Sequence, residues 1–418
     1  MLRLNVIETL NVREMSQEDT QRWLKEVMSK IIDNLGPDID KARYELYQLV
    51  DTVMSTQFYV RVKFRDRSKK NGDEEISLVL KRSAQTNPEI RRGYCMDSQF
   101  YNEIVFYRTY AQLHDNLPRC YYVDYRPPTD SVIALENIVQ RGYHPCPYTM
   151  DVPLEYTLAI VRVLARFHGK GYVMKELRRE EFLDIVAGFR KTRFEEVPYD
   201  NIFGNLIGQS ATRAVEYLRR HGYDADFCDK TEALFSNAME NVMMEAIQPR
   251  EPLCTLCHGD FTVSNMFFKA EDDGKYSAML IDFACVSYLT PATDLSMYLC
   301  LFSPNGLTKD NFYKIMRVYH DTLKECLLDA GIQDVAKYSY EAFLDDFRKS
   351  SLYGFCAATS YLPICLGYSI PICPKKVFEM GFTAYANICK QAGGDEVSKI
   401  LADTLLRLKE LGCLEHVL

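Results

Sequence analysis

The chain lacks an excess of basic residues, low-complexity tracts, internal repeats and long blocks of like charge. Lys and Arg total 50 against 58 Asp and Glu, and the net charge of −8 gives no general attraction to nucleic acid or anionic lipid. The missing repeats exclude a solenoid, and the missing biased tracts exclude a long disordered interaction tail. We therefore expect a folded protein whose partner is a small molecule and not a nucleic acid. The sequence leaves the oligomeric state open.

The chain also lacks a clean apolar segment of the kind that enters a membrane. Near the N-terminus, Glu8, Arg13 and Glu14 come too early for the apolar core of a secretory signal. Residues 350–374 carry no charge and are long enough to span a bilayer, but prolines, glycines and polar residues interrupt them. We expect a buried helix with an irregular continuation there, and no membrane partner.

Fourteen cysteines are scattered unevenly, often inside apolar runs such as residues 355–357 and 364–366. This distribution is typical of reduced, buried thiols and not of a disulfide framework. It favours a cytoplasmic location. With 418 residues the chain is longer than one ordinary core supports, so we expect two lobes.

The residue patterns predict an α+β fold. Apolar residues at helical spacing between Ser16 and Met54 predict a helical preface that ends at a break in residues 51–55. Residues 58–64 alternate apolar and charged side chains, and together with residues 76–81 they predict a hairpin that ends at Lys81.

Further along, the patterns predict a helix at residues 98–110 and short strands at residues 121–124 and 131–136. From residue 150 onward the pattern is mostly helical. We therefore expect an N-terminal lobe of antiparallel sheet plus helix, residues 1–136, and a larger α-rich lobe, residues 137–418.

Most of the candidate catalytic and metal-binding residues lie in one predicted loop and the hairpin that follows it. Residues 257–265 read Cys-His-Gly-Asp-Phe-Thr-Val-Ser-Asn, and a predicted hairpin then leads to Asp282. Asp260 can accept a proton from a substrate hydroxyl, while Asn265 and Asp282 can hold Mg²⁺ on the phosphates of a nucleotide. Each residue alone could cap a turn or end a strand. Their combined spacing predicts phosphoryl transfer from ATP.

Two residues of the N-terminal lobe complete the same template. Lys81 ends an apolar strand, where burial would be costly without a partner, and Glu103 in the next predicted helix can supply that partner. In phosphoryl transfer such a lysine contacts the α- and β-phosphates. The alternative is a solvated lysine and a surface glutamate.

Two other readings of the catalytic loop remain open. Cys254, Cys257 and His258 match the Cys-x-x-Cys-His pattern of haem attachment, and the two cysteines could also contribute to a zinc site. The loop already accounts for His258, to which we assign structural support. Asp294, which follows the Asp282 loop, would accept backbone N–H groups from the catalytic loop or simply cap a helix.

These motifs together resemble the ecdysteroid kinase-like family, within the aminoglycoside-phosphotransferase and choline-kinase branch of the protein-kinase-like fold. The resemblance implies a bilobal kinase-like fold, ATP and Mg²⁺ as cofactors, and a small-molecule hydroxyl as acceptor. Asp260 would be the base, Asn265 and Asp282 the metal ligands, and Lys81 with Glu103 the pair that positions phosphate. It further implies that Glu136, Asn137 and Ile138 form the hinge facing adenine, and that the acceptor is an ecdysteroid-like steroid or another apolar alcohol or phenol.

The sequence departs from the family pattern at residues 51–58, which should cover the phosphates but contain no glycine. Glycine lets backbone N–H groups approach phosphate closely, and the hydroxyls of Ser55 and Thr56 would have to substitute. Two alternatives therefore stand beside an active kinase. One is a silent kinase-like protein that binds a hydrophobic ligand, and the other is a choline or ethanolamine kinase.

Overall fold

A computed structural model describes residues 17–418 apart from 70–71, 115–116, 194–200, 369 and 372. The described chain forms two compact units, one ending at Tyr143 and the other comprising His144–Leu418. The lobe boundary predicted after Glu136 lies before the short 3-10 turn Ile138–Arg141, which the contacts place in the first unit. The first unit is a sheet with helices and the second is rich in helices, which is the predicted α+β architecture.

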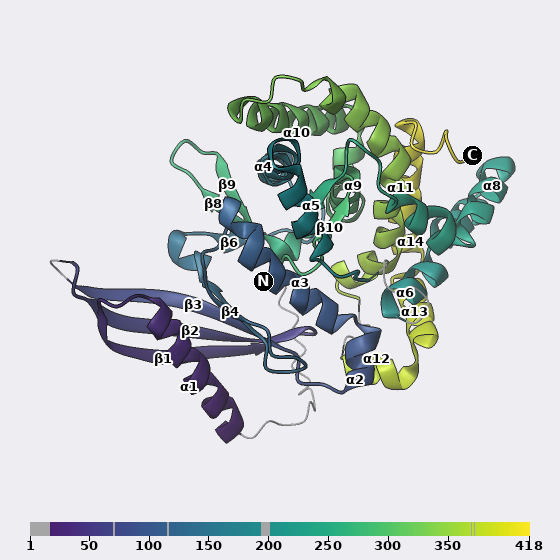
Figure 1. Cartoon of the computed structure of the whole chain (residues 1–418). Helices are drawn as coiled ribbons and strands as arrows, with labels where there is room; N and C mark the ends of the chain where they lie inside the picture. The colour runs from purple at the N-terminus through teal and green to yellow at the C-terminus, as the bar shows by residue number, and fades with distance from the viewer. Residues whose placement is uncertain (1–16, 70–71, 115–116, 194–200, 369, 372) are drawn as a thin grey trace. The chain divides into compact units, whose positions relative to one another are not determined.

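The N-terminal unit is built on a five-stranded antiparallel sheet with the order β1-β2-β3-β5-β4. Helix α1 lies across one face of this sheet (Figure 1), and its residues Trp23, Val27 and Ile31 are buried in one core with strand residues such as Leu78 and Leu80. The strands are β1 Ile39–Asp51, β2 Ser55–Asp66, β3 Asp73–Ser83, β4 Cys120–Asp124 and β5 Val132–Glu136, and the helices are α1 Gln17–Asn34, α2 Pro88–Gly93 and α3 Met96–Thr109.

The alternation of side chains along β3 determines which face of the sheet Lys81 lies on. Side chains along a strand face opposite sides in turn, and Leu78 and Leu80 enter the core under α1. Lys81 therefore faces the other side of the sheet, where it is paired in register with Gln57 of β2 and Ile133 of β5. The predicted hairpin that ends at this lysine is confirmed.

The predicted helical preface is wrong for residues 39–51, which form strand β1. The segment is rich in Lys, Arg, Glu, Leu and Gln, which favour helices when considered locally. Pairing with β2 overrides that preference because it satisfies the backbone of an otherwise open sheet edge. The sequence did hold a stop signal, since α1 ends just before Gly36, which has φ 128°, and Pro37, which lacks an N–H.

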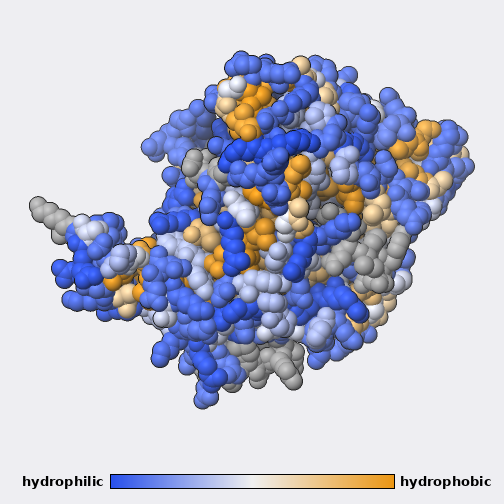
Figure 2. Space-filling model, in the orientation of Figure 1, coloured by the Kyte–Doolittle hydropathy of each residue, from blue (hydrophilic) through white to orange (hydrophobic). Residues whose placement is uncertain are grey.

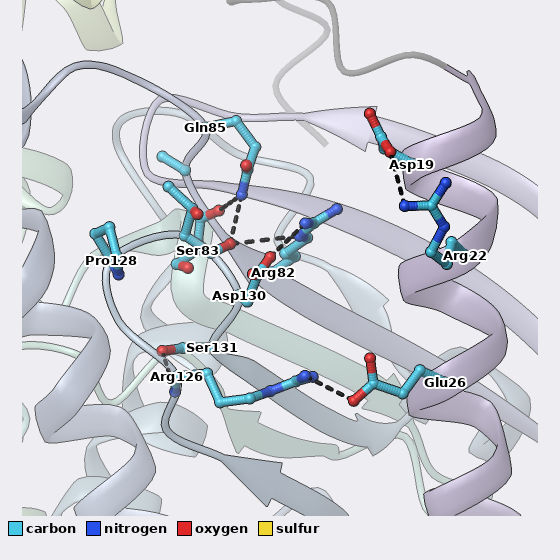
Figure 3. A network of polar contacts seen from close by, with 12 residues as sticks. Asp19, Arg22, Glu26, Arg82, Ser83, Gln85, Arg126, Pro128, Asp130 and Ser131 are labelled. Carbon is cyan, nitrogen blue, oxygen red and sulfur yellow. Dashed lines mark hydrogen bonds and ion pairs between the residues drawn. The ribbon is translucent and has the colours of Figure 1, made fainter.

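A polar network ties the strand carrying Lys81 to the loop between β4 and β5 (Figure 3). The guanidinium of Arg82 donates to Asp130 at 2.5 Å and lies over the ring of Trp23, with its Cζ 4.5 Å from the ring centroid. Gln85 donates to the carbonyls of Ser83 and Thr129 in the same network. These bonds fix the end of β3 immediately beyond Lys81.

The C-terminal unit combines two small sheets with packed helices (Figure 1). One sheet has the order β6-β8-β9 and the other pairs β7 with β10, both antiparallel. The strands are β6 His144–Pro145, β7 Thr255–Cys257, β8 Met266–Ala270, β9 Tyr276–Leu280 and β10 Ser287–Leu289. The helices are α4 Leu154–Leu177, α5 Arg179–Ala187, α6 Ile202–Ser210, α7 Arg213–Arg220, α8 Ala225–Phe235, α9 Pro291–Phe302, α10 Lys309–Asp329, α11 Tyr340–Cys365, α12 Pro374–Met380, α13 Phe382–Gln391 and α14 Gly394–Glu410, with a π-helical segment at Met239–Met244.

The uncharged stretch that begins at Ser350 lies mostly in helix α11, and most of its side chains within that helix are buried. Gly354 allows α11 to approach α9, because a Cβ there would lie 2.1 Å from the carbonyl carbon of Ser296. The predicted buried helix is confirmed. Among the described residues no helix combines the length and apolarity needed to cross a membrane, and the face in Figure 2 shows apolar patches scattered among polar residues.

Candidate active site

In the N-terminal unit the structure brings Lys81 and Glu103 together. The Nζ of Lys81 donates to Oε2 of Glu103 at 2.5 Å, and the two side chains are 12% and 1% exposed. A pair this deeply buried is unlike the weak ion pairs of protein surfaces, because neither charge can be removed without leaving the other desolvated. The predicted surface alternative for these two residues is therefore wrong.

The glycine-free turn between β1 and β2 is closed by its own side chains. The Oγ1 of Thr52 donates to the carbonyl of Ser55 at 2.8 Å and accepts from the Ser55 N–H at 3.1 Å. The hydroxyl of Thr56 donates to Asp51 at 2.6 Å. The hydroxyl of the buried Ser55 lies 3.3 Å from Oγ1 of Thr52, so both hydroxyls expected to substitute for glycine are engaged within the turn.

The predicted hinge residues comprise the last residue of β5, Glu136, and the two residues after it. The N–H groups of Glu136 and Asn137 donate to the carbonyls of Arg119 and Ser77, at 2.8 and 2.9 Å. The amide of Asn137 donates to the hydroxyl of Tyr47 at 3.0 Å, and Ile138 is buried. Tyr47 was missed by sequence reasoning because it lies in β1, the segment predicted as helix.

In the C-terminal unit the loop predicted to be catalytic follows β7. Gly259 has φ 74°, a conformation that favours glycine, and a Cβ on it would lie 1.9 Å from the carbonyl oxygen of Cys285. Glycine is therefore required for the loop that carries Asp260 to lie against the segment that follows Asp282. The predicted hairpin is confirmed by the antiparallel pairing of β8 with β9, and the Ile281 N–H donates to the Asn265 carbonyl at 3.1 Å.

Asp294 and His258 hold this loop in shape. The carboxylate of Asp294 accepts the backbone N–H groups of His258 and Gly259 at 2.7 and 2.9 Å, and it also accepts Nε2 of His168 at 3.1 Å. His258 donates through Nε2 to the Ile281 carbonyl at 3.0 Å and accepts the Asp260 N–H at Nδ1, 3.2 Å away. His258 thus connects Asp260 to Ile281, the residue that precedes Asp282.

Asp260 has a partner that the sequence did not reveal. Both of its carboxylate oxygens accept from the guanidinium of Arg193, at 3.0 and 3.1 Å, and the Asn265 amide donates to Oδ2 at 3.2 Å. Burial by itself would raise the pKa of Asp260, but the Arg193 charge, helped by His258 and Asn265, outweighs it and lowers that pKa. No motif marks Arg193, because it lies 67 residues before Asp260 in the chain.

The two predicted metal ligands are side chains whose chemistry suits Mg²⁺. The Asn265 amide nitrogen donates to the carbonyl and carboxylate of Asp260, which leaves the amide oxygen as the atom suited to a cation. Asp282 has φ 66°, a backbone conformation rare for a residue with a side chain and frequent at functional sites. An amide oxygen and a carboxylate on neighbouring strand ends match the oxygen ligands of Mg²⁺.

A second cluster of ligand-type atoms is explained without a metal. His168, Cys257 and Asp294 place such atoms within 4.8 Å of one another. The carboxylate accepts three N–H groups, Nδ1 of His168 lies 2.9 Å from the Tyr319 hydroxyl, and the Cys257 thiol donates to the Leu289 carbonyl. Both ring nitrogens of His258 are also engaged, so the haem and zinc readings find no support among the described residues.

The Lys81–Glu103 pair in one unit, and Asp260, Asn265 and Asp282 in the other, are the side-chain types that phosphoryl transfer requires, which indicates the class of small-molecule kinases. A sequence model of the ecdysteroid kinase-like family matches residues 50–332, more than half of the 418 residues. The chain belongs to this family.

Comparisons with individual proteins add only distant similarity. No curated protein matches the chain in sequence. Wild-type aminoglycoside 2′-phosphotransferase IIIa in its GDP complex has 13% identity and a TM-score of 0.41, with 90% of this chain and 98% of that chain covered. A GDP complex of a point mutant of that enzyme has 13% identity and a TM-score of 0.38, covering 93% and 97%. Because these similarities are distant, the assignment rests on the family match.

Proposed function

We propose that the protein is an ATP-dependent kinase that transfers the γ-phosphate to a hydroxyl of a small, apolar alcohol or phenol, with ecdysteroid-like steroids as the first class to test. The observation that carries the proposal is the loop around Asp260, in which Asp294 and His258 fix the backbone, Asn265 contacts Asp260, and His258 bonds to the residue before Asp282. Free thiols at all fourteen cysteines support a cytoplasmic location.

In the proposed reaction the acceptor oxygen attacks the γ-phosphorus, the bond from that phosphorus to the bridging oxygen breaks, and ADP leaves. Asp260 takes the proton of the acceptor hydroxyl, and Lys81, held by Glu103, contacts the α- and β-phosphates. Mg²⁺, when bound, neutralises phosphate charge, and Asn265 and Asp282 are the residues suited to hold it. Positioning and charge neutralisation are most of what this chemistry needs from a protein.

The surroundings of Asp260 favour a neutral, partly apolar acceptor. The Arg193 guanidinium lies over the ring of Phe203, 5.2 Å from its centroid. The Tyr361 hydroxyl is buried and makes no hydrogen bond with any described residue. The charges of Arg193 and Asp260 both act on the pKa of this hydroxyl. That hydroxyl could bind a second oxygen of a polyhydroxylated acceptor. The Arg193 cation beside Asp260 disfavours choline or ethanolamine, which carry the same charge.

A silent ligand-binding protein is the second candidate. The turn between β1 and β2 presents the carboxylate of Asp51 where the family pattern expects glycine, and its hydroxyls are engaged in that turn. A carboxylate close to phosphates would weaken nucleotide binding. This candidate predicts binding of the apolar ligand without consumption of ATP.

The test is a phosphorylation assay with a panel of ecdysteroids, sterols and phenols, read by mass spectrometry for the gain of one phosphate. We expect one class to react and Asp260→Asn to lower the rate by about 100- to 10,000-fold. Asp272→Asn is the control, because Asp272 is exposed on the β8–β9 turn. The kinase proposal fails if the wild type yields no phosphorylated product, or if Asp260→Asn reacts as fast as the control.

A further inference from the structure

The contact between Arg193 and Asp260 is unexpected for a catalytic base. A base needs an open lone pair for the proton of the acceptor, yet both oxygens of Asp260 accept from Arg193 and Oδ2 also accepts from Asn265. Two parallel N–H bonds to a carboxylate form the strongest common ion-pair geometry. These contacts neutralise the charge of Asp260 and occupy both of its oxygens.

Arg193 is also held in place more firmly than a surface arginine. Its backbone has φ 47°, and its carbonyl accepts from the Asn201 amide at 2.7 Å. Asn201 is itself buried and caps α6 by accepting the Gly204 N–H at 3.0 Å. The first turn of α6 also supplies the Phe203 ring beneath the guanidinium. The fold therefore delivers this cation to the base from a separate element.

The guanidinium keeps unused binding capacity. Its Nε is buried and bonds to no other described residue. A cavity of about 20 Å³, room for roughly one water molecule, is lined by Arg193, Gly259 and Cys285 among others. The Arg193 guanidinium thus bonds to Asp260 through Nη1 and Nη2, while Nε has no partner among the described residues and a small cavity adjoins the side chain.

We propose that Arg193 exchanges partners during the reaction, binding Asp260 in the nucleotide-free protein and the γ-phosphate when ATP is present. The inference rests on the proposed function. The acceptor oxygen must lie about 3 Å from both the base and the γ-phosphorus, so a cation now 3.0 Å from the base is within a side-chain rotation of the phosphate oxygens. A phosphate dianion is a stronger partner for a guanidinium than a carboxylate is, and the exchange frees Asp260 to accept the proton.

Isothermal titration calorimetry with Mg-ATP and Mg-ADP tests the exchange without any acceptor. The wild type, Arg193→Gln and Arg193→Lys are compared, with Lys191→Gln as the control that removes an exposed charge from the same turn. We expect Arg193→Gln to lower the affinity for ATP relative to ADP by about 10- to 100-fold, the range of a charge-assisted hydrogen bond, and Arg193→Lys to recover part of this loss. The control should leave the ratio unchanged.

The same titrations with Asp260→Asn provide a second test of the exchange. Because this substitution releases Arg193 from its present partner, ATP should bind more tightly than to the wild type while ADP binding stays the same. The gain should vanish in the double variant Asp260→Asn/Arg193→Gln. If Arg193 is only a structural partner, Arg193→Gln weakens ATP and ADP equally and the double variant keeps the gain, which overturns the inference. A wild type that binds neither nucleotide would instead refute the proposed kinase function.

Discussion

Replacing Asp294 by Asn tests whether this carboxylate shapes the catalytic loop. Asp294 is 1% exposed and accepts three N–H groups, with Oδ2 serving His258 and His168 and Oδ1 serving Gly259. Asparagine has nearly the same shape but only one acceptor oxygen. At least one of the three N–H groups must then face an NH₂ group.

The expected cost follows from these contacts. If the amide oxygen takes the position of Oδ2, the Gly259 N–H becomes a buried donor without an acceptor, which costs about 1–3 kcal/mol. The hydrogen bonds from the His258 N–H and from Nε2 of His168 would remain, but their acceptor would be neutral, which weakens each bond by about 1 kcal/mol. A neutral amide is less costly to bury than a carboxylate, so we expect the lower end of the sum, about 3 kcal/mol. That is a large share of the ~5–15 kcal/mol that stabilises a typical domain.

Urea unfolding followed by far-UV circular dichroism measures this loss, because most helices lie in the unit that contains Asp294. Hydrogen exchange of the peptide spanning residues 256–262 gives a local measure and should accelerate at least tenfold. Asp184→Asn is the control, since Asp184 is exposed on α5 and its replacement should change stability by no more than about 0.5 kcal/mol. A loss below about 1 kcal/mol for Asp294→Asn, with unchanged exchange, would refute the argument.

Three further predictions follow from single contacts. Gly259→Ala should cost more than about 3 kcal/mol in urea unfolding because the new Cβ meets a carbonyl oxygen at 1.9 Å, whereas Gly274→Ala, with φ 78° and nothing within 4 Å, should cost about 1–2 kcal/mol. Burial raises the pKa of Asp346 from 3.8 to about 6, so the folded state binds this proton more tightly and the wild type loses stability as pH rises between those values. Asp346→Asn should thus be more stable than the wild type by about 3 kcal/mol at pH 8 and equal to it at pH 3, and a constant difference across that range would contradict the burial argument. Lys81→Met should cost about 3–5 kcal/mol because it removes the cation paired with the carboxylate of Glu103, which is 1% exposed, and Lys81→Met/Glu103→Leu should recover most of that stability but no phosphotransfer.

The local sequence was sufficient to predict the strands in which apolar and polar residues follow a clear pattern. The alternation before Lys81 predicted β2 and β3, and the spacing from Asp260 to Asp282 predicted the β8–β9 hairpin. The strands of each hairpin are neighbours in the sequence and bury one face, so the period of their apolar residues is sufficient to predict them. The same reasoning failed for residues 39–51, because an exposed edge strand has no buried face to impose a period and its helix-favouring residues dominate the local signal.

The sequence by itself thus determined the family and the chemical types of the candidate site, since a base, an amide and a carboxylate at fixed spacing are local facts. Only the tertiary structure decided which other side chains meet them. It placed Arg193 on Asp260 across 67 residues of chain, and it joined His168 to Asp294 across 126. Such partners share no local pattern, because the free energy that selects them comes from burying and pairing charges that become neighbours only after the helices pack.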